Sequence, residues 1–276
     1  MFRFVLLAAT VAALLAVQPV VAATPHRIIS LSPTATESLF AIGAGKQVVA
    51  VDDQSDYPKR APRTSLSGYT PNVEAIAGYR PDLVVLSGNP NDTVSGLRKL
   101  GIRVLLQPAA KNLTEAYAEI GQLGVVTGHR KSAKALVSRM KKAIAKTVAS
   151  VPKRHLSVYH ELDPTYFSAT SQTFIGRIYK LFGLRNIADA ADSTASGYPQ
   201  LSGEYIIAQS PALIVLADTR CCGQSAATVA NRPGWSGIAA VRNHRVGGID
   251  DSVASRWGPR VVNFVQAVAK ALRRKT

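Results

Sequence analysis

The chain has 276 residues, of which 47% are hydrophobic, and it carries a formal net charge of +16. This length and hydrophobic content suffice for one large domain or two of ordinary size, and they exclude an intrinsically disordered chain. The positive charge attracts phosphate, anionic lipid or acidic partners. The lysines and arginines are spread along the chain without a nucleic-acid motif, so we interpret them as a solvated basic surface and predict no nucleic-acid partner.

The amino-terminal segment is predicted to be a secretory signal peptide, residues 1–23. It starts Met1-Phe2-Arg3, continues through an apolar run and ends with Val21-Ala22-Ala23. The run is nearly long enough to span a membrane, so an uncleaved anchor is the alternative reading. The basic start and the small-residue end favour cleavage near Ala23 and export. No cysteine follows the apolar run, so no lipid anchor is predicted.

Strand and helix patterns alternate in the first half of the mature chain. After the strand at residues 27–31, a helix is predicted to begin near Ser32, with a capping-box spacing between Thr34 and Glu37. Strands are expected at residues 47–51, 82–86 and 102–106, with helices around residues 72–78 and 92–100. This order is typical of a parallel, doubly wound sheet, so residues 24–126 are predicted to form an amino-terminal α/β lobe.

The middle of the chain, from about residue 112 to 150, is almost wholly helical in pattern. Its last part, Arg130 to Lys146, contains seven basic residues and no acidic residue, which makes one face too polar for a core. Pro152 ends the pattern. We predict a rigid linking helix within residues 127–152. Strand patterns resume at residues 155–160, 213–217 and 245–249 and a last helix at about residues 259–274, so residues 153–276 are predicted to form a second α/β lobe.

An internal repeat at an offset of 130 residues relates the two halves. The segment from Glu74 to Leu86 aligns with the segment from Glu204 to Leu216, and each has a capping residue, a short helix, a proline and a buried strand. The identical pairs include the glutamates, the prolines and three strand residues. The sequence therefore predicts two similar lobes that face each other.

The repeated glutamates, Glu74 and Glu204, lie two residues after a capping residue, where the helix dipole favours a carboxylate. Local capping alone explains them. Equivalent carboxylates on two lobes also form a symmetric pair of surface anchors that a dimeric membrane partner with basic pockets would bind together. The residues alone leave both interpretations open.

Three tyrosines, Tyr57, Tyr69 and Tyr198, lie in turn-rich loops after strands. Loops at that edge of an open α/β sheet border its ligand crevice, and tyrosine there can stack on a flat ligand while its hydroxyl hydrogen-bonds. The alternative is that these rings only cover the edge of each lobe.

Catalytic motifs are absent from the sequence. There is no nucleophile elbow, no His-Glu-x-x-His and no phosphate-binding loop, so no catalytic and no metal-ligating residues are predicted. The two cysteines, Cys221 and Cys222, are adjacent, so no long-range disulfide framework exists within the chain. A strained small-ring disulfide, a paired-thiol ligand site, an intermolecular link and free thiols all remain open.

Several motifs together resemble the periplasmic cobalamin-binding proteins of ABC importers, whose relatives bind haem or ferric siderophores. They are Arg27 to Pro33 with Thr36-Glu37, Ser55 to Pro58, and Glu74 with Arg80 to Val84. The resemblance covers essentially the whole mature chain. It implies an α/β fold of two similar doubly wound lobes joined by one long interdomain helix with little hinge motion, a monomer located in the periplasm, and no cofactor other than the carried ligand.

The resemblance also implies roles for particular residues. Glu74 and Glu204 fall on the two glutamates that meet the importer's membrane subunits. Tyr57, Tyr69, Phe167 and Tyr198 match aromatic positions around the ligand, although tyrosine replaces tryptophan at two of them. The loop from Gly248 to Ser252 matches one that gives polar contacts, which makes Asp250 and Asp251 candidates; two turn-forming acids are the alternative.

The leading hypothesis from the sequence is capture of a corrinoid such as cobalamin and delivery to an ABC importer. Haem is the first alternative, with Tyr57, Tyr69 or His160 as candidate axial ligands, and a ferric siderophore is the second. A hydrolase on the same sheet and a pure interaction protein without a ligand are hypotheses from other classes.

Overall fold

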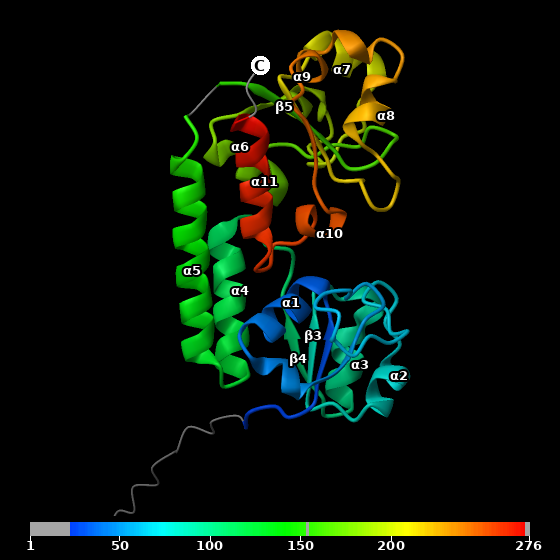
Figure 1. The fold of residues 1–276 in the computed structure, drawn as a ribbon. Helices are drawn as coiled ribbons and strands as arrows, with labels where there is room; N and C mark the ends of the chain where they lie inside the picture. Colours follow the sequence, from blue (N-terminus) through cyan, green and yellow to red (C-terminus); the bar gives the residue numbers. More distant parts are fainter. Residues whose placement is uncertain (1–22, 153–154, 274–276) are drawn as a thin grey trace, which may run out of the picture.

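The computed structural model describes residues 23–152 and 155–273 (Figure 1). In the amino-terminal lobe, four parallel strands have the order β2-β1-β3-β4. Their bounds are β1 Ile28–Leu31, β2 Val48–Val51, β3 Leu83–Leu86 and β4 Arg103–Leu106, which confirms the four predicted strands to within one residue. The helices of this lobe are α1 Pro33–Ala41, α2 Val73–Gly78 and α3 Thr93–Lys99. Residues 1–22 of the predicted signal peptide lie outside the described residues.

The carboxy-terminal lobe repeats this arrangement, with four parallel strands in the order β6-β5-β7-β8. Its strands are β5 Ser157–Glu161, β6 Arg185–Asn186, β7 Leu213–Leu216 and β8 Val246–Gly248. Its helices are α6 Phe174–Leu181, α7 Gly203–Gln209, α8 Ala226–Ala230, α9 Ala239–Arg242 and α10 Asp251–Ala254. The sequence missed β6 because a strand of two residues is too short to show an alternating pattern.

The 130-residue repeat extends to hydrogen bonds and backbone angles. Asn72 caps α2 by accepting from Ala75 N at 2.8 Å, and Ser202 caps α7 by accepting from Tyr205 N at 3.1 Å. After these helices, Arg80 and Ser210 both adopt left-handed backbone, with φ of 49° and 39°. The two lobes are therefore copies of one structural unit.

The stretch predicted to be almost wholly helical, from about residue 112 to 150, forms two antiparallel helices. They are α4 Leu113–Val126 and α5 Arg130–Ala149, separated by a turn at residues 127–129. The 20-residue α5 runs past both lobes (Figure 1), as expected for a linking helix. Its buried side chains recur every three or four residues and form one apolar stripe: Ala133, Leu136, Met140 and Ile144. Within the described residues, no helix is long and apolar enough to cross a bilayer.

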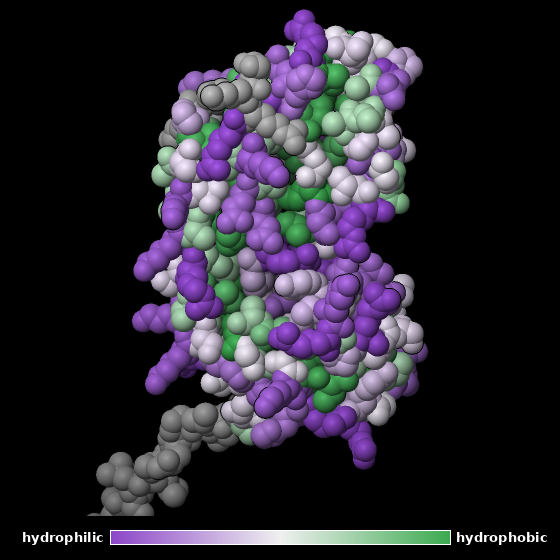
Figure 2. Space-filling view, viewed as in Figure 1, coloured by the Kyte–Doolittle hydropathy of each residue, from purple (hydrophilic) through white to green (hydrophobic). Residues whose placement is uncertain are grey.

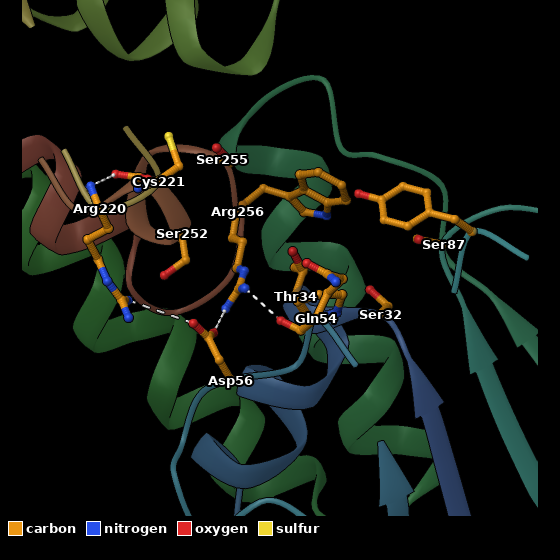
Figure 3. Close-up of a pocket in the computed structure, with 14 residues that line it drawn as sticks. Ser32, Thr34, Gln54, Asp56, Ser87, Arg220, Cys221, Ser252, Ser255 and Arg256 are labelled. Carbon is orange, nitrogen blue, oxygen red and sulfur yellow. Dashed lines mark hydrogen bonds and ion pairs between the residues drawn. The ribbon is translucent and has the colours of Figure 1, made fainter. Parts of the chain in front are cut away.

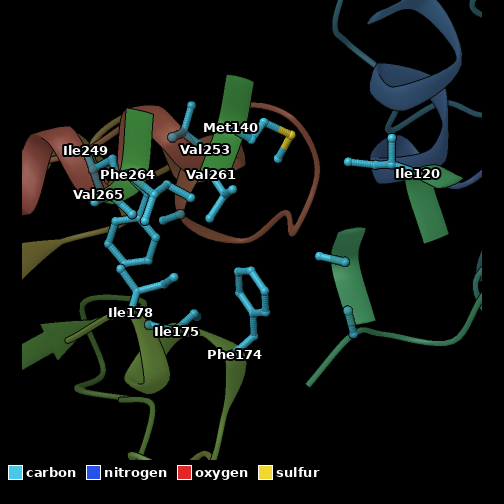
Figure 4. Close-up of a cluster of buried hydrophobic side chains, with 14 of the residues drawn as sticks. Ile120, Met140, Phe174, Ile175, Ile178, Ile249, Val253, Val261, Phe264 and Val265 are labelled. Atoms are coloured by element: carbon cyan, nitrogen blue, oxygen red, sulfur yellow. The ribbon is translucent and has the colours of Figure 1, made fainter. Parts of the chain in front are cut away.

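The largest apolar cluster runs through the linking helices from one lobe to the other. It includes Ile28 and Leu39 of the first lobe, Ile120 and Met140 of α4 and α5, and Phe174 of the second lobe. Figure 4 shows how helix α11, Val261–Arg273, contributes Val261, Phe264 and Val265 to the same cluster. Because interiors are close-packed, this shared core joins both lobes to the linking helices. The limited hinge motion that the resemblance implies stays a prediction.

The predicted capping box at the start of α1 is wrong. The capping residue is Ser32, whose Oγ accepts from Ala35 N at 3.3 Å, and Pro33 is the first helical residue. Glu37 is 2% exposed, and its carboxylate accepts hydrogen bonds from Arg256 and Arg260. This buried carboxylate contributes to the contact between the lobes described below.

Candidate functional site

A cavity of about 540 Å³ lies between the two lobes. Figure 2 shows the corresponding indentation on the edge of the molecule opposite α5. Both lobes contribute to its lining: Ser32, Pro33, Thr34, Gln54, Asp56, Tyr69, Ser87, Arg220, Cys221, Asp251, Ser252, Ser255, Arg256 and Trp257.

These residues reach the cavity because they follow the carboxyl ends of parallel strands. Ser32 follows β1, Asp56 lies in the loop after β2, and Ser87 follows β3; Arg220 and Asp251 come after β7 and β8. Open α/β sheets bind ligands in the crevice at that edge. Two such edges therefore face each other across the cavity (Figure 3).

Two arginines of the second lobe bind carboxylates of the first lobe across the cleft. Arg256 Nη1 donates to Glu37 at 3.0 Å and to Asp56 at 2.7 Å. Arg260 donates to both oxygens of Glu37, at 2.9 and 2.5 Å. Both arginine side chains are largely buried. Charge-assisted hydrogen bonds of this kind fix the relative position of the lobes in addition to the shared core.

Three further cavities adjoin the central one by sharing lining residues with it. One of about 630 Å³ contains Tyr57 and shares Asp56, and one of about 310 Å³ contains Tyr69 and shares Ser87. The third, of about 340 Å³, contains Tyr198 and shares Trp257. The central cavity and its neighbours therefore lie around the same cleft, and each is within the usual size range of ligand sites.

The four aromatic residues predicted to contact ligand are all exposed. Tyr57, Tyr69, Phe167 and Tyr198 have 46%, 79%, 38% and 48% of their surface exposed, so their rings are available to a ligand. The Tyr57 ring already has a cation above it, with the Arg260 guanidinium 4.4 Å from the ring centre. Phe167 is not among the lining residues of these four cavities.

Asp250 and Asp251 both border the cleft, but their carboxylates already accept hydrogen bonds within the protein. Asp250 caps α10 and forms an ion pair with Arg220 at 3.1 Å. Asp251 accepts from Arg220 N at 3.0 Å and from Cys221 N at 2.7 Å. Both acids therefore shape the loops of the cleft wall, and direct contact with ligand stays a prediction.

Two carboxyl groups beside the cleft have raised pKa values. Burial raises the pKa of Asp52, which lines the Tyr69 cavity, to about 6. Burial raises the pKa of Glu119 to about 7, although the Trp257 indole donates to it at 2.8 Å. Their raised pKa values keep these carboxyl groups protonated up to a higher pH than usual, and a protonated carboxyl can donate a hydrogen bond as well as accept one.

His160, a candidate axial ligand for haem, cannot reach the cleft. It is fully buried in β5, where its Nδ1 lies 2.6 Å from the Tyr179 hydroxyl. Burial lowers the pKa of His160 to about 3, so the ring is neutral. The strand pattern could not show this, because neighbouring helices decide what covers a strand residue.

The repeated glutamates lie on the outer surface of the lobes. Glu74 and Glu204 are exposed at the second position of α2 and α7, and neither forms an ion pair with any described residue. Figure 1 places both helices on the side of the molecule remote from α5. Both carboxylates are exposed, and their role in docking stays a prediction.

The sequence patterns missed several cleft residues, chiefly Arg220, Arg256 and Trp257. No local pattern marks them, because they follow short or irregular segments after β7 and β8. The combination of an arginine and a tryptophan in Ser255-Arg256-Trp257-Gly258 was the only available hint.

A family model described as periplasmic binding protein matches residues 28–253. The chain belongs to the periplasmic binding protein family. Its relatives include an uncharacterized ABC transporter substrate-binding lipoprotein of Bacillus subtilis, 32% identical over 90% of this chain and 80% of the relative. A cobalamin-binding protein of Halobacterium salinarum is 31% identical over 91% of this chain and 70% of its own length.

Solved structures of this family confirm the two-lobe architecture. The periplasmic vitamin B12 binding protein BtuF of Vibrio cholerae is 26% identical, with a TM-score of 0.71 over 90% of this chain and 97% of that one. The periplasmic haem-binding protein HutB of the same species is 24% identical, with a TM-score of 0.79, and the match covers 90% of this chain and 98% of HutB. The Bacillus subtilis relative is named as a substrate-binding lipoprotein of an ABC transporter and the others as binding proteins, so the relatives support a substrate-binding protein at the family level.

Proposed function

We propose that this protein captures a corrinoid such as cobalamin in the cleft outside the cytoplasmic membrane and delivers it to an ABC importer. The main support is the charge balance of the central cavity. Its charged lining residues are two carboxylates, Asp56 and Asp251, and two guanidinium groups, Arg220 and Arg256, although the whole chain carries +16. The guanidinium groups are already paired with carboxylates.

A charge-balanced, hydrogen-bonding wall fits a ligand whose edge consists of uncharged amides. Cobalamin has such an edge, and its large corrin ring offers a flat surface to Tyr69, Tyr198 and Trp257. A siderophore with several negative charges would require unpaired cations at the centre of the cleft instead. Named cobalamin and vitamin B12 binders among the relatives further support a corrinoid.

Haem is the second candidate, and one observation favours it. The Tyr57 cavity is lined by four basic residues and only two acidic ones, and unlike the central cavity it would attract the two haem carboxylates. Tyr57 is also a chemically suitable axial ligand for ferric iron.

Binding measurements on the purified mature protein distinguish the two ligands. We expect cyanocobalamin to bind with micromolar or better affinity by calorimetry, and Tyr69→Leu to weaken binding about three- to tenfold because a stacking surface is lost. Tyr117→Leu on α4, outside the cleft, is the matched control and should bind normally. A haemin complex with a shifted Soret band that Tyr57→Phe abolishes, together with no cobalamin binding, would establish the alternative.

We further propose that Glu74 and Glu204 bind arginine-bearing pockets on the two membrane subunits of the importer. Their exposure, their lack of ion-pair partners and their equivalent positions support this. Transport in reconstituted vesicles should be lost in the Glu74→Gln, Glu204→Gln double variant with unchanged ligand affinity. Asp92→Asn, an exposed acid elsewhere on the first lobe, should transport normally. Full transport by the double variant would refute the docking role. We expect the ligand-bound protein to be a monomer before docking.

A further inference from the structure

Two adjacent cysteines, Cys221 and Cys222, lie in the loop at the wall of the central cavity, which Cys221 lines (Figure 3). Both cysteines are exposed. No other cysteine occurs in the chain. The loop that carries them connects β7 to α8 and therefore lies at the ligand-facing edge of the second lobe.

The cysteine loop is held on one side and unobstructed on the other. Asp251 accepts from Thr219 Oγ1 at 3.2 Å, Arg220 N at 3.0 Å and Cys221 N at 2.7 Å, so this carboxylate fixes the chain up to Cys221. Beyond Cys222, Gly223 turns the chain with φ of 66° and has no heavy atom within 4 Å of a Cβ position. The Cys222 carbonyl accepts from the Gln224 side chain at 3.3 Å, and a change in the Cys221–Cys222 peptide would have to adjust this contact.

From these contacts we propose that Cys221 and Cys222 are a redox modification site, which closes to a vicinal disulfide in the exported protein and then forms part of the ligand-contacting wall. An oxidising compartment favours the disulfide over an exposed pair of adjacent thiols, and each of these thiols has only the other as a disulfide partner within the chain. The role in ligand contact rests on the function proposed above.

The chemistry is an ordinary thiol–disulfide exchange. The thiolate of one cysteine attacks the disulfide of an exported thiol oxidase or of oxidised glutathione, which forms a mixed disulfide and releases one thiol of the oxidant. The second cysteine then attacks the first sulfur, so that the S–S bond between Cys221 and Cys222 forms and the other thiol of the oxidant leaves. The chain loses two electrons and two protons, and the oxidant gains them.

Ring closure changes the cavity wall in two ways. The Cys221 thiol hydrogen-bonds to Cys222 and to Asp251, and these contacts raise its pKa to about 12; the disulfide has no hydrogen to donate. Oxidation therefore frees a position on Asp251 for a ligand amide. It also places a compact apolar S–S surface beside the ligand and restricts the loop before binding, which lowers the entropy cost of complex formation.

The disulfide would be readily reduced. Consecutive Cα atoms lie about 3.8 Å apart, closer than the usual span of a disulfide, and strained disulfides have more oxidising potentials. We therefore expect the pair to change state with the redox conditions outside the cytoplasm, and ligand affinity to change with it.

The first test needs no ligand. Mature protein is incubated with oxidised glutathione, and its intact mass and iodoacetamide labelling are measured. The proposal expects a monomer that has lost two hydrogen atoms, accepts no label, and accepts two labels after reduction. A stable glutathione adduct, a disulfide-linked dimer or a persistent dithiol would overturn it.

The second test measures cyanocobalamin affinity in both redox states and in the Cys221→Ser, Cys222→Ser double variant. We expect the oxidised protein to bind about three- to tenfold more tightly than the reduced protein, and the variant to bind alike with and without reductant. Equal affinity in both states would refute the role in ligand contact. If no form bound cyanocobalamin, the proposed ligand would be wrong, whereas the mass measurement would still decide whether the disulfide forms.

Discussion

Removing the carboxylate of Glu37 should destabilise the whole protein more than any exposed acid does. Glu37 is 2% exposed and accepts hydrogen bonds from Arg256 at 3.0 Å and from Arg260 at 2.9 and 2.5 Å. Deleting one partner of a buried ion pair costs about 3–5 kcal/mol, because the remaining charge is left without compensation. Here Arg256 keeps Asp56 at 2.7 Å and the backbone oxygen of Gln54 at 2.9 Å. We therefore expect about 3 kcal/mol for Glu37→Ala.

Urea unfolding followed by tryptophan fluorescence measures this effect. With a slope of about 2–3 kcal/mol per molar urea, Glu37→Ala should lower the midpoint by about 1 M or more. Glu74→Gln, an exposed carboxylate on the same lobe, should change the free energy of unfolding by less than about 0.5 kcal/mol. Replacing Glu37, Arg256 and Arg260 together with Leu, Met and Met should cost less than Glu37→Ala, because no buried charge is then left alone. A Glu37→Ala midpoint equal to that of the parent would refute the reasoning.

Three further predictions follow from buried groups. The pKa of the buried His160 is about 3, so this ring stays neutral in the folded protein while the unfolded chain takes up a proton near pH 6.5. Lowering the pH from 7 to 4.5 should therefore reduce the stability advantage of the parent over His160→Gln by about 2 kcal/mol. A constant difference in urea unfolding would contradict this. The pKa of Glu119 is raised in the folded protein, so its contribution to stability declines as rising pH ionises it. Because the Trp257 indole donates to Glu119, the fluorescence of Trp257 should titrate near pH 7 in the parent but not in Glu119→Gln. The Phe264 ring is 0% exposed and packs edge-on against Tyr179, with ring centroids 5.7 Å apart. Phe264→Ala should therefore lower the free energy of unfolding, measured by thermal unfolding, by about 3–5 kcal/mol. A loss below about 1 kcal/mol would mean that this part of the core is loosely packed.

The sequence by itself determined the elements of regular structure that have strong local patterns. Strand patterns identified seven of the eight strands in the described part of the chain, and the 130-residue repeat identified the two similar lobes. The tyrosines near the cleft were also predictable, because loops after parallel strands must lie at the same edge of a sheet. The boundaries of the lobes and the ligand roles of these residues stay predictions.

Only the tertiary structure decided how the two lobes are joined across the cleft. Glu37 is separated from Arg256 and Arg260 by 219 and 223 residues, and Trp257 from Glu119 by 138. Local periodicity reports which face of an element is buried, but it carries no information about which distant side chain meets that face. The same reason explains why the pattern of α1 suggested a helix cap for Glu37, whereas packing of the second lobe made it a buried ion-pair partner.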